Sequence, residues 1–257
     1  MKNSEINYFI KNGFFKIKLQ RSNFLYLKNR IKDILKKQFN FKKVNLEKLH
    51  KKIKIEELND LRLKVFKKIN DDNKFKKNTY QSAKKFIHET VGNELCSSDI
   101  NLSIQLPNDK SSLLEMHSDF FSGESLFQIN LWIPLVNVKK TQSMFIINPT
   151  DSLKILKKIK YDKTLKFDDI NKKFKKKIRW VNLKSGEAIL FSPNCLHGNV
   201  VNREKNTRWS INIRYKNIYS PYGKERNEKK IGSFYTLLNP KAVTRFNLKY
   251  DFDEITN

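Results

Sequence analysis

Residues 186–215 read GEAILFSPNCLHGNVVNREKNTRWSINIRY and decide the fold class. Two apolar-rich runs within them, 187–191 and 207–215, have the length and the β-branched and aromatic content typical of strands. The connection between the runs contains Pro193, which breaks regular structure, and a single histidine, His197. The segment therefore predicts two strands joined by a connection that presents His197.

Similar short runs occur on the N-terminal side of this segment. Further strands are expected at 101–106, 126–135, 143–147 and 178–183. Glycine and proline separate these runs, and many short strands with such breaks are typical of a sandwich or small barrel. The expected core is therefore rich in β-structure.

The first third of the chain has a different pattern. Residues 8–19 predict the end of a helix, a turn and a strand, whereas apolar residues at helical spacing predict helices over 22–39, 45–70 and about 79–91. A lysine-rich helical insert is expected over 151–176, and the tail after Ser220 is expected to wrap the body. We therefore expect one domain over residues 1–257, with a mostly helical part at 1–98, a β-core at 99–217 and a C-terminal extension at 218–257.

The 257 residues include 53 Lys plus Arg against 26 Asp plus Glu, a formal net charge of +27. Of these cations 44 are lysine and only nine are arginine, and the lysines are spread through almost every segment. Arginine is the residue that reads phosphates and base edges with a planar fork. The charge therefore indicates solvated surfaces, and no nucleic-acid partner is expected.

Two cysteines, Cys96 and Cys195, exclude a disulfide scaffold, and they lack the spacing of a structural zinc site. No apolar run is long enough for a membrane span, and the first residues do not predict a secretory signal. We expect a soluble, cytoplasmic protein of unknown oligomeric state.

Three of the polar residues could bind a metal. His50 and His88 lie in predicted helices and are expected to be structural. His117 and Asp119 lie two positions apart, which places both side chains on one face of an extended backbone. With His197 they would make the facial triad of two imidazoles and one carboxylate found in non-heme iron oxygenases. Glu115 is an alternative source of the carboxylate.

The strand after His197 predicts an unusual polar face. In residues 206–216, alternate positions place four polar or cationic side chains on one face: Arg208, Ser210, Asn212 and Arg214. Such a face is costly to bury unless an anion pairs with it, and a guanidinium can form two charge-assisted hydrogen bonds with a carboxylate. Arg208 and Ser210 are thus suited to the distal carboxylate of 2-oxoglutarate. Arg214 could instead take that role, or the face could be solvent-exposed.

The order of His117, Asp119, His197, Arg208 and Ser210 resembles that in Fe(II)/2-oxoglutarate dioxygenases of the phytanoyl-CoA dioxygenase type. The sequences at 8–19, 131–152 and 183–202 also look similar to this family. More narrowly, IQLPNDKSSLLEMHSDFFSGES at 104–125 and TRWSINIRYKNIYSPYG at 207–223 resemble oxygenases associated with carbohydrate biosynthesis clusters.

The resemblance implies a double-stranded β-helix (jelly-roll, cupin-like) core with N-terminal helices packed outside. It also implies an enzyme that uses Fe(II), 2-oxoglutarate and O2 to hydroxylate a small molecule that contains a sugar. Trp132 is expected to lie near the co-substrate, and Arg214 is expected to face the substrate. Apart from the resemblance, Gln105, Gln128 and Asn130 lie on neighbouring predicted strands. Gln105 and Asn130 are taken as further residues that bind the co-substrate, although each of the three amides could equally contact substrate or be a satisfied structural amide. The chain departs from the family at 142–143 and 150–151, where the family often has glycine and Ser-His.

Three alternatives stay open on the sequence. The same iron could support desaturation, epimerisation or halogenation, although Asp119 occupies the position that a halide would need. The same two imidazoles and carboxylate could bind zinc for hydrolysis, but Arg208 and Ser210 would then have no role. A non-enzymatic β-barrel that binds carbohydrate or polyanions is the remaining alternative.

Overall fold

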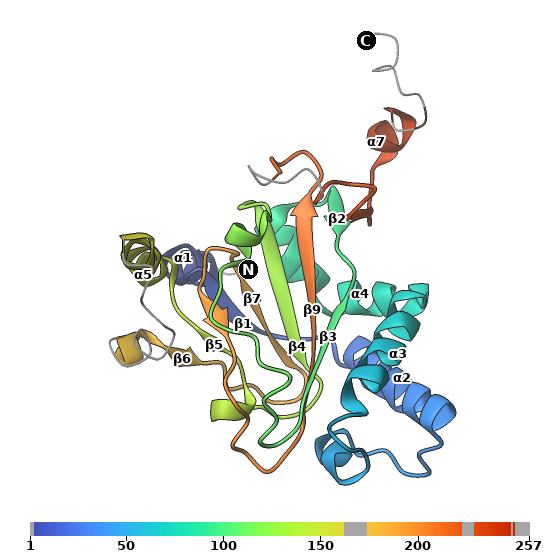
Figure 1. Ribbon diagram of the computed structural model, residues 1–257. Coiled ribbons are helices and arrows are strands. Elements are labelled where there is room, and N and C mark those ends of the chain that lie inside the picture. The colour runs from blue at the N-terminus through green and yellow to red at the C-terminus, as the bar shows by residue number, and fades with distance from the viewer. Residues whose placement is uncertain (1–2, 162–173, 223–228, 248, 250–257) are drawn as a thin grey trace.

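The computed structural model describes residues 3–161, 174–222, 229–247 and 249. Its strands form a seven-stranded and a three-stranded sheet, both built from antiparallel pairs (Figure 1). The larger sheet has the order β1-β7-β4-β9-β2-β10, with β3 also paired to β9, and the smaller sheet has the order β6-β5-β8. The larger sheet contains β1 (Phe14–Lys18), β2 (Leu95–Ser97), β3 (Asn101–Gln105), β4 (Gln128–Pro134), β7 (Glu187–Phe191), β9 (Arg208–Asn217) and β10 (Thr236–Leu237). The smaller sheet contains β5 (Phe145–Ile146), β6 (Arg179–Trp180) and β8 (His197–Gly198).

Strand β9 is the centre of the larger sheet, since it pairs with β2, β3 and β4. One of its faces contributes Trp209, Ile211 and Tyr215 to the hydrophobic core, where each is completely buried. Its opposite face carries the predicted polar residues, beginning with Arg208, which is 2% exposed. The apolar and polar faces that the alternating sequence predicted are therefore both present in β9. The polar face is not open to solvent.

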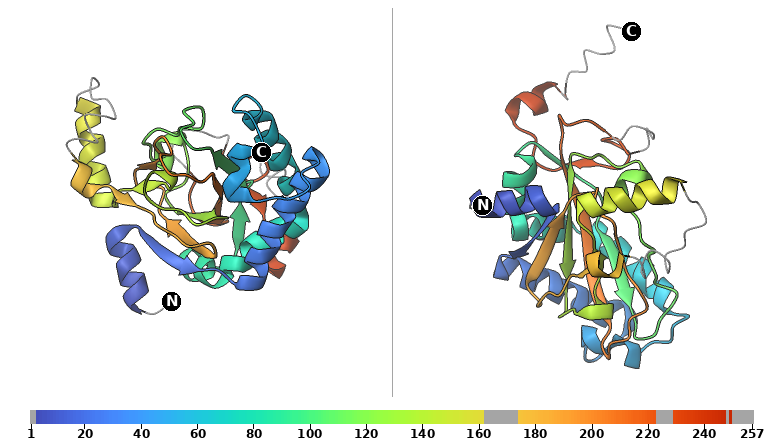
Figure 2. Two further views of the ribbon diagram at one scale, coloured as in Figure 1. Left: turned by 90° about the horizontal axis from the view of Figure 1, so that it is seen from below. Right: turned by 90° about the vertical axis from the view of Figure 1, so that its left-hand side faces the viewer.

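Helices cover the larger sheet on the side away from the smaller one (Figure 2). They are α2 (Arg21–Phe39), α3 (Leu58–Asn70) and α4 (Asn73–Val91). In α2 the side chains of Phe24, Leu27, Ile31 and Leu35 are buried, and their spacing of three and four residues makes one apolar stripe. The outer elements are α1 (Asn3–Asn12), α5 (Pro149–Tyr161), α7 (Ala242–Asn247) and the short 3-10 helices at 46–51, 119–122, 140–142 and 175–177.

The helical pattern predicted over 45–70 is interrupted in the structure. The 3-10 helix Leu46–Lys51 ends before residues 52–57, and α3 begins only at Leu58. Tertiary contacts explain the break: the Trp209 indole N–H donates to Leu46 O at 3.0 Å, and the Thr207 N–H donates to Glu47 O at 2.8 Å. These bonds fix the short helix to the start of β9, which outweighs the local helical preference.

All three regions of the chain contribute strands to the larger sheet. β1 comes from the mostly helical N-terminal part and pairs with β7, and β10 comes from the C-terminal extension and pairs with β2. Of the expected helical insert, residues 162–173 lie outside the described residues. No helix in the described ranges is long and apolar enough to cross a membrane.

We predict that Gly13→Ala destabilises the protein by about 2–4 kcal/mol in urea unfolding. Gly13 has φ +72°, and an added Cβ would meet Pro149 and lie 2.8 Å from the sulfur of Cys195. The left-handed backbone and the overpacking each cost on the order of 1–3 kcal/mol. Gly232→Ala is the matched control, since Gly232 also has positive φ but nothing lies within 4 Å of its added Cβ. Equal losses in the two variants would contradict the packing argument.

Candidate metal centre and adjoining cavity

Backbone pairing brings the two predicted histidines together. The N–H of His117 donates to the carbonyl of His197, and the N–H of His197 donates to the carbonyl of His117, both at 2.9 Å. His197 belongs to β8, whereas His117 lies just before the 3-10 helix that begins at Asp119. A reciprocal pair of this kind fixes both backbones in an antiparallel bridge. Residues eighty positions apart therefore face one point.

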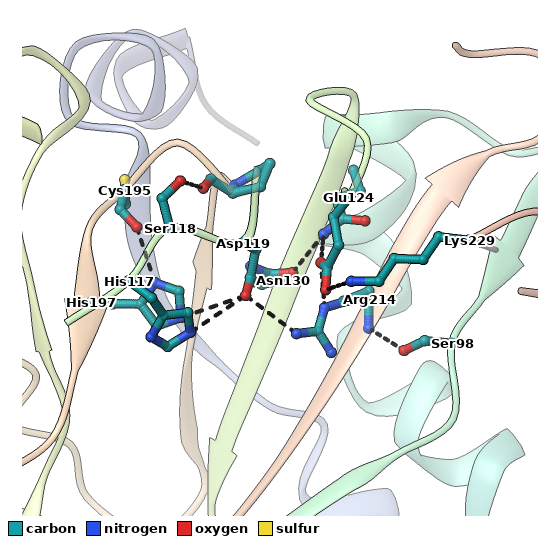
Figure 3. A network of polar contacts seen from close by, with 12 residues as sticks. Ser98, His117, Ser118, Asp119, Glu124, Asn130, Cys195, His197, Arg214 and Lys229 are labelled. Carbon is teal, nitrogen blue, oxygen red and sulfur yellow. Dashed lines mark hydrogen bonds and ion pairs between the residues drawn. The ribbon is translucent and has the colours of Figure 1, made fainter. Parts of the chain in front are cut away.

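The side chains of His117, Asp119 and His197 converge on that point (Figure 3). One carboxylate oxygen, Oδ1 of Asp119, is 3.6 Å from Nε2 of His117 and 4.0 Å from Nε2 of His197. One ligand atom from each residue lies within 4.8 Å of the others. This is the only such cluster of three or more metal-binding side chains among the described residues.

The outer nitrogen of each imidazole is hydrogen-bonded to the backbone. Nδ1 of His117 lies 2.8 Å from the carbonyl of Glu115, and Nδ1 of His197 lies 2.9 Å from the carbonyl of Cys195. A carbonyl oxygen can only accept, so each Nδ1 carries a proton, and Nε2 of each ring faces the shared point, where it offers a lone pair when the ring is neutral. Backbone contacts of this kind orient metal-binding histidines.

The charge states of these residues suit a cation. Burial lowers the pKa of His197 to about 4, so its imidazole is neutral at pH 7. Burial would raise the pKa of Asp119, but His117, His197 and Arg214 outweigh burial and hold that pKa well below its usual range. Burial would also lower the pKa of His117, but the nearby Asp119 carboxylate and the carbonyl of Glu115 outweigh burial and raise that pKa above its ordinary value. An ionised carboxylate thus attracts positive charge to the centre of the cluster.

A buried polar network holds Asp119 in place. The amide of Asn130 donates to Oδ2 at 2.6 Å, and Nη2 of Arg214 lies 3.3 Å from Oδ1. Arg214 also donates through Nε to Glu124 at 2.5 Å, and Lys229 donates to the other oxygen of Glu124 at 2.8 Å. The Glu124 carboxylate is 2% exposed in this arrangement. Gln128 donates to Glu124 as well, and it accepts from the hydroxyl of Tyr235.

The network contains residues that the sequence analysis missed. Glu124, Lys229 and Tyr235 were not among the candidate site residues. Neither carboxylate spacing nor periodicity singles out Glu124, because its partners come from β9 and from the C-terminal extension. That Lys229 lies beside a buried acid could be recognised only from the tertiary structure.

A cavity of about 520 Å³ adjoins the candidate metal centre. His117, Asp119 and His197 line it, as do Trp132 on β4 and the four polar side chains of β9, Arg208, Ser210, Asn212 and Arg214. The structure therefore brings together most of the residues that the sequence analysis selected. Their arrangement in one cavity permits a metal and a small organic ligand to bind side by side.

Arg208 is buried in this cavity without a carboxylate partner among the described residues. Its Nη2 donates to the hydroxyl of Ser103 at 2.9 Å, but its Nε has no hydrogen-bond partner in the described residues. The hydroxyl of Ser210 is also buried and unpartnered there. Burial lowers the pKa of Arg208 to about 10, so it still carries a positive charge at pH 7. A buried, unpaired guanidinium beside a free hydroxyl is a binding place for an anion.

Gln105 and Asn130 are not among the residues that line the cavity. The amide of Gln105 donates to the carbonyl of Val200 at 2.8 Å, and the amide of Asn130 donates to Asp119. Contact with a ligand in the cavity therefore does not follow for either residue. Glu115, the alternative carboxylate, is exposed and outside the metal-binding cluster.

Protein-family models and curated proteins gave no match to this chain. Solved structures do resemble it. The non-heme monooxygenase ThoJ in complex with nickel has a TM-score of 0.57 at 14% identity, over 97% of this chain and 95% of that one. The chain has the jelly-roll fold of non-heme oxygenases.

Two further structures support this conclusion about the fold. HygX from Streptomyces hygroscopicus, with nickel and 2-oxoglutarate bound, has a TM-score of 0.55 at 10% identity, over 94% of this chain and 97% of HygX. EctD from S. alaskensis, with 2-oxoglutarate and 5-hydroxyectoine, has a TM-score of 0.54 at 13% identity, over 95% of this chain and 86% of EctD. At such identities the likeness concerns the jelly-roll fold alone.

We predict that Glu124→Gln destabilises the protein by about 3–5 kcal/mol in chemical denaturation. Removing one partner of a buried ion pair leaves an uncompensated charge, here on Lys229, while Arg214 keeps only its contact with Asp119. Glu115→Gln provides the matched control, because Glu115 is exposed nearby, and a change of no more than about 0.5 kcal/mol is expected. If the two variants unfold alike, the network does not stabilise the site.

Proposed function

We propose that the protein is a non-heme oxygenase that depends on Fe(II) and 2-oxoglutarate. The observation that carries the proposal is the presence, in one cavity, of a His-Asp-His cluster and a buried guanidinium without a carboxylate partner in the described residues. The first can bind a divalent metal and the second a carboxylate, and the oxygenase chemistry requires both. The shared jelly-roll fold is consistent with this function.

His117, Asp119 and His197 would hold the iron. Two imidazoles and one carboxylate suit Fe(II), and three protein ligands leave open positions for a co-substrate and for oxygen. The residues fit this group, since both Nε2 atoms and Oδ1 of Asp119 face one point. Asn130 would act on a bound metal only through Asp119, because its bond to Oδ2 orients the carboxylate and leaves Oδ1 toward the histidines.

Arg208 and Ser210 would hold the distal carboxylate of 2-oxoglutarate. The Nε of Arg208 and the hydroxyl of Ser210 are the unpartnered donors there, and Ser103 fixes the guanidinium through Nη2. Trp132 supplies an aromatic wall of the same cavity. Burial of Arg208 excludes water, which strengthens its attraction for a carboxylate.

Bound iron would supply the oxidising chemistry, in which 2-oxoglutarate is decarboxylated to succinate and a substrate C–H bond is hydroxylated. The chain positions the reactants and excludes water from the cavity. We propose a small-molecule substrate that contains a sugar, in surface glycan or secondary carbohydrate biosynthesis. The resemblance of residues 104–125 and 207–223 to oxygenases of carbohydrate biosynthesis clusters supports this substrate class.

Two of the alternative functions are less well supported. A hydrolytic zinc site would use the same three ligands but leaves Arg208 and Ser210 without a role. A carbohydrate-binding module without a metal has no use for three convergent metal-binding side chains. We place the protein in the cytoplasm, where cysteines stay reduced.

We predict that anaerobic addition of Fe(II) and 2-oxoglutarate produces the weak visible charge-transfer band of the bound pair. His197→Ala should abolish the band, because one metal ligand is lost. Arg208→Ala should weaken 2-oxoglutarate binding by about thirtyfold or more, since loss of a buried charge partner costs about 2 kcal/mol or more, while iron affinity changes little.

Arg203→Ala is the matched control for Arg208→Ala, because Arg203 is exposed and does not line the cavity. Its affinity for both ligands should equal that of the unmodified protein. The role assigned to Arg208 is wrong if its removal weakens iron and 2-oxoglutarate binding equally, or weakens neither.

A further inference from the structure

The positive and negative side chains that line the cavity are unequal in number. Four cations line it, Arg62, Arg208, Arg214 and Lys229, against two carboxylates, Asp119 and Glu124. The described lining therefore has a surplus of two positive charges. Fe(II) and the doubly negative 2-oxoglutarate would cancel each other, so a fully loaded site would keep the same surplus. A third ligand with negative charge would be needed to neutralise it.

The surplus does not lie in the deep part of the cavity. Arg208 would be neutralised there by the distal carboxylate of 2-oxoglutarate, and Asp119 would be neutralised by the metal. Glu124 must then serve both Arg214 and Lys229, although it carries only one negative charge. The uncompensated charges are therefore one cation of this pair and Arg62.

Lys229 is better placed than Arg214 to meet a substrate. The side chain of Lys229 is 20% exposed, whereas that of Arg214 is 11% exposed and is held by both Asp119 and Glu124. In Figure 3 Lys229 reaches in from the C-terminal extension to the end of the network away from the histidines. Arg62 on α3 is exposed and bonds only to Asn59 of its own helix among its described contacts.

We infer that the substrate of the proposed oxygenase carries an anionic group, a phosphate or a carboxylate, which Lys229 and Arg62 bind in the outer part of the cavity. The inference rests on the proposed function, because the charge count assumes bound iron and 2-oxoglutarate. Most of the 44 lysines contribute a diffuse field, whereas Lys229 places its charge in the cavity wall beside a buried acid. Charge at a partly desolvated position attracts an anion more strongly than charge on an open surface.

The test measures binding of three probes to the protein loaded with Fe(II) and saturating 2-oxoglutarate under anaerobic conditions. The probes are glucose 1-phosphate, glucuronate and glucose, which share a sugar ring and differ in charge. Calorimetry gives the affinity, and the charge-transfer band reports that iron and 2-oxoglutarate stay bound. We expect one or both anionic probes to bind at least tenfold more tightly than glucose, and the tighter of the two identifies the anion.

Variants locate the anion. Lys229→Gln should weaken binding of the preferred anionic probe by about tenfold, and Arg62→Gln should weaken it by about threefold. Neither variant should change the affinity for glucose. Lys230→Gln and Lys64→Gln are the matched controls, since both lysines are exposed neighbours that do not line the cavity, and they should change affinity by less than about twofold. Arg62→Gln alters an exposed side chain, so its effect stays interpretable even if Lys229→Gln fails to fold.

The outcomes separate this inference from the proposed function. Absence of the charge-transfer band in the unmodified protein would overturn the proposed function itself. An intact band with no preference for the anionic probes would overturn only the inference, as would equal effects of Arg62→Gln and Lys64→Gln. The preference for an anion together with a selective loss in the cavity variants would support it.

Discussion

The site depends on the reciprocal backbone hydrogen bonds between His117 and His197. These two bonds join a loop of the middle of the chain to the smaller sheet, and they bring both imidazoles to one face. Asp119 follows two residues later at the start of a 3-10 helix, so its carboxylate reaches the same point. The convergence of the three side chains is therefore a consequence of main-chain pairing.

Close packing at β8 protects this pairing. A Cβ on Gly198 would lie 2.9 Å from the carbonyl of Leu114 and 3.0 Å from that of Glu115, closer than ordinary contacts. The side chain of Asn199 holds the same two segments together, since its Oδ1 accepts from the N–H of Leu114 at 2.7 Å. The loop before His117 is thus held against the strand that carries His197, and both carbonyls that orient the imidazoles stay in place.

The sequence predicted the parts of the site that depend on local periodicity. The spacing of His117 and Asp119 and the alternation along β9 follow from backbone geometry, so these residues could be selected without coordinates. Gln105 also alternates in a strand, but its amide bonds to Val200 on a distant segment, which no periodicity reveals. Glu124 and Lys229 escaped prediction for the same reason. The break within 45–70 arises from bonds to β9, again a tertiary effect.

Arg208 and Arg214 differ in the side chains that surround them. They lie on the same face of β9, six residues apart, on the order of 20 Å along an extended strand. The sequence left open which arginine would bind the co-substrate. Arg214 is held by two carboxylates, whereas Arg208 is more deeply buried and has no acid beside it among the described residues. Because a buried charge needs a counter-charge, we propose Arg208 as the arginine that takes an anionic ligand, whereas Arg214 already contacts Asp119.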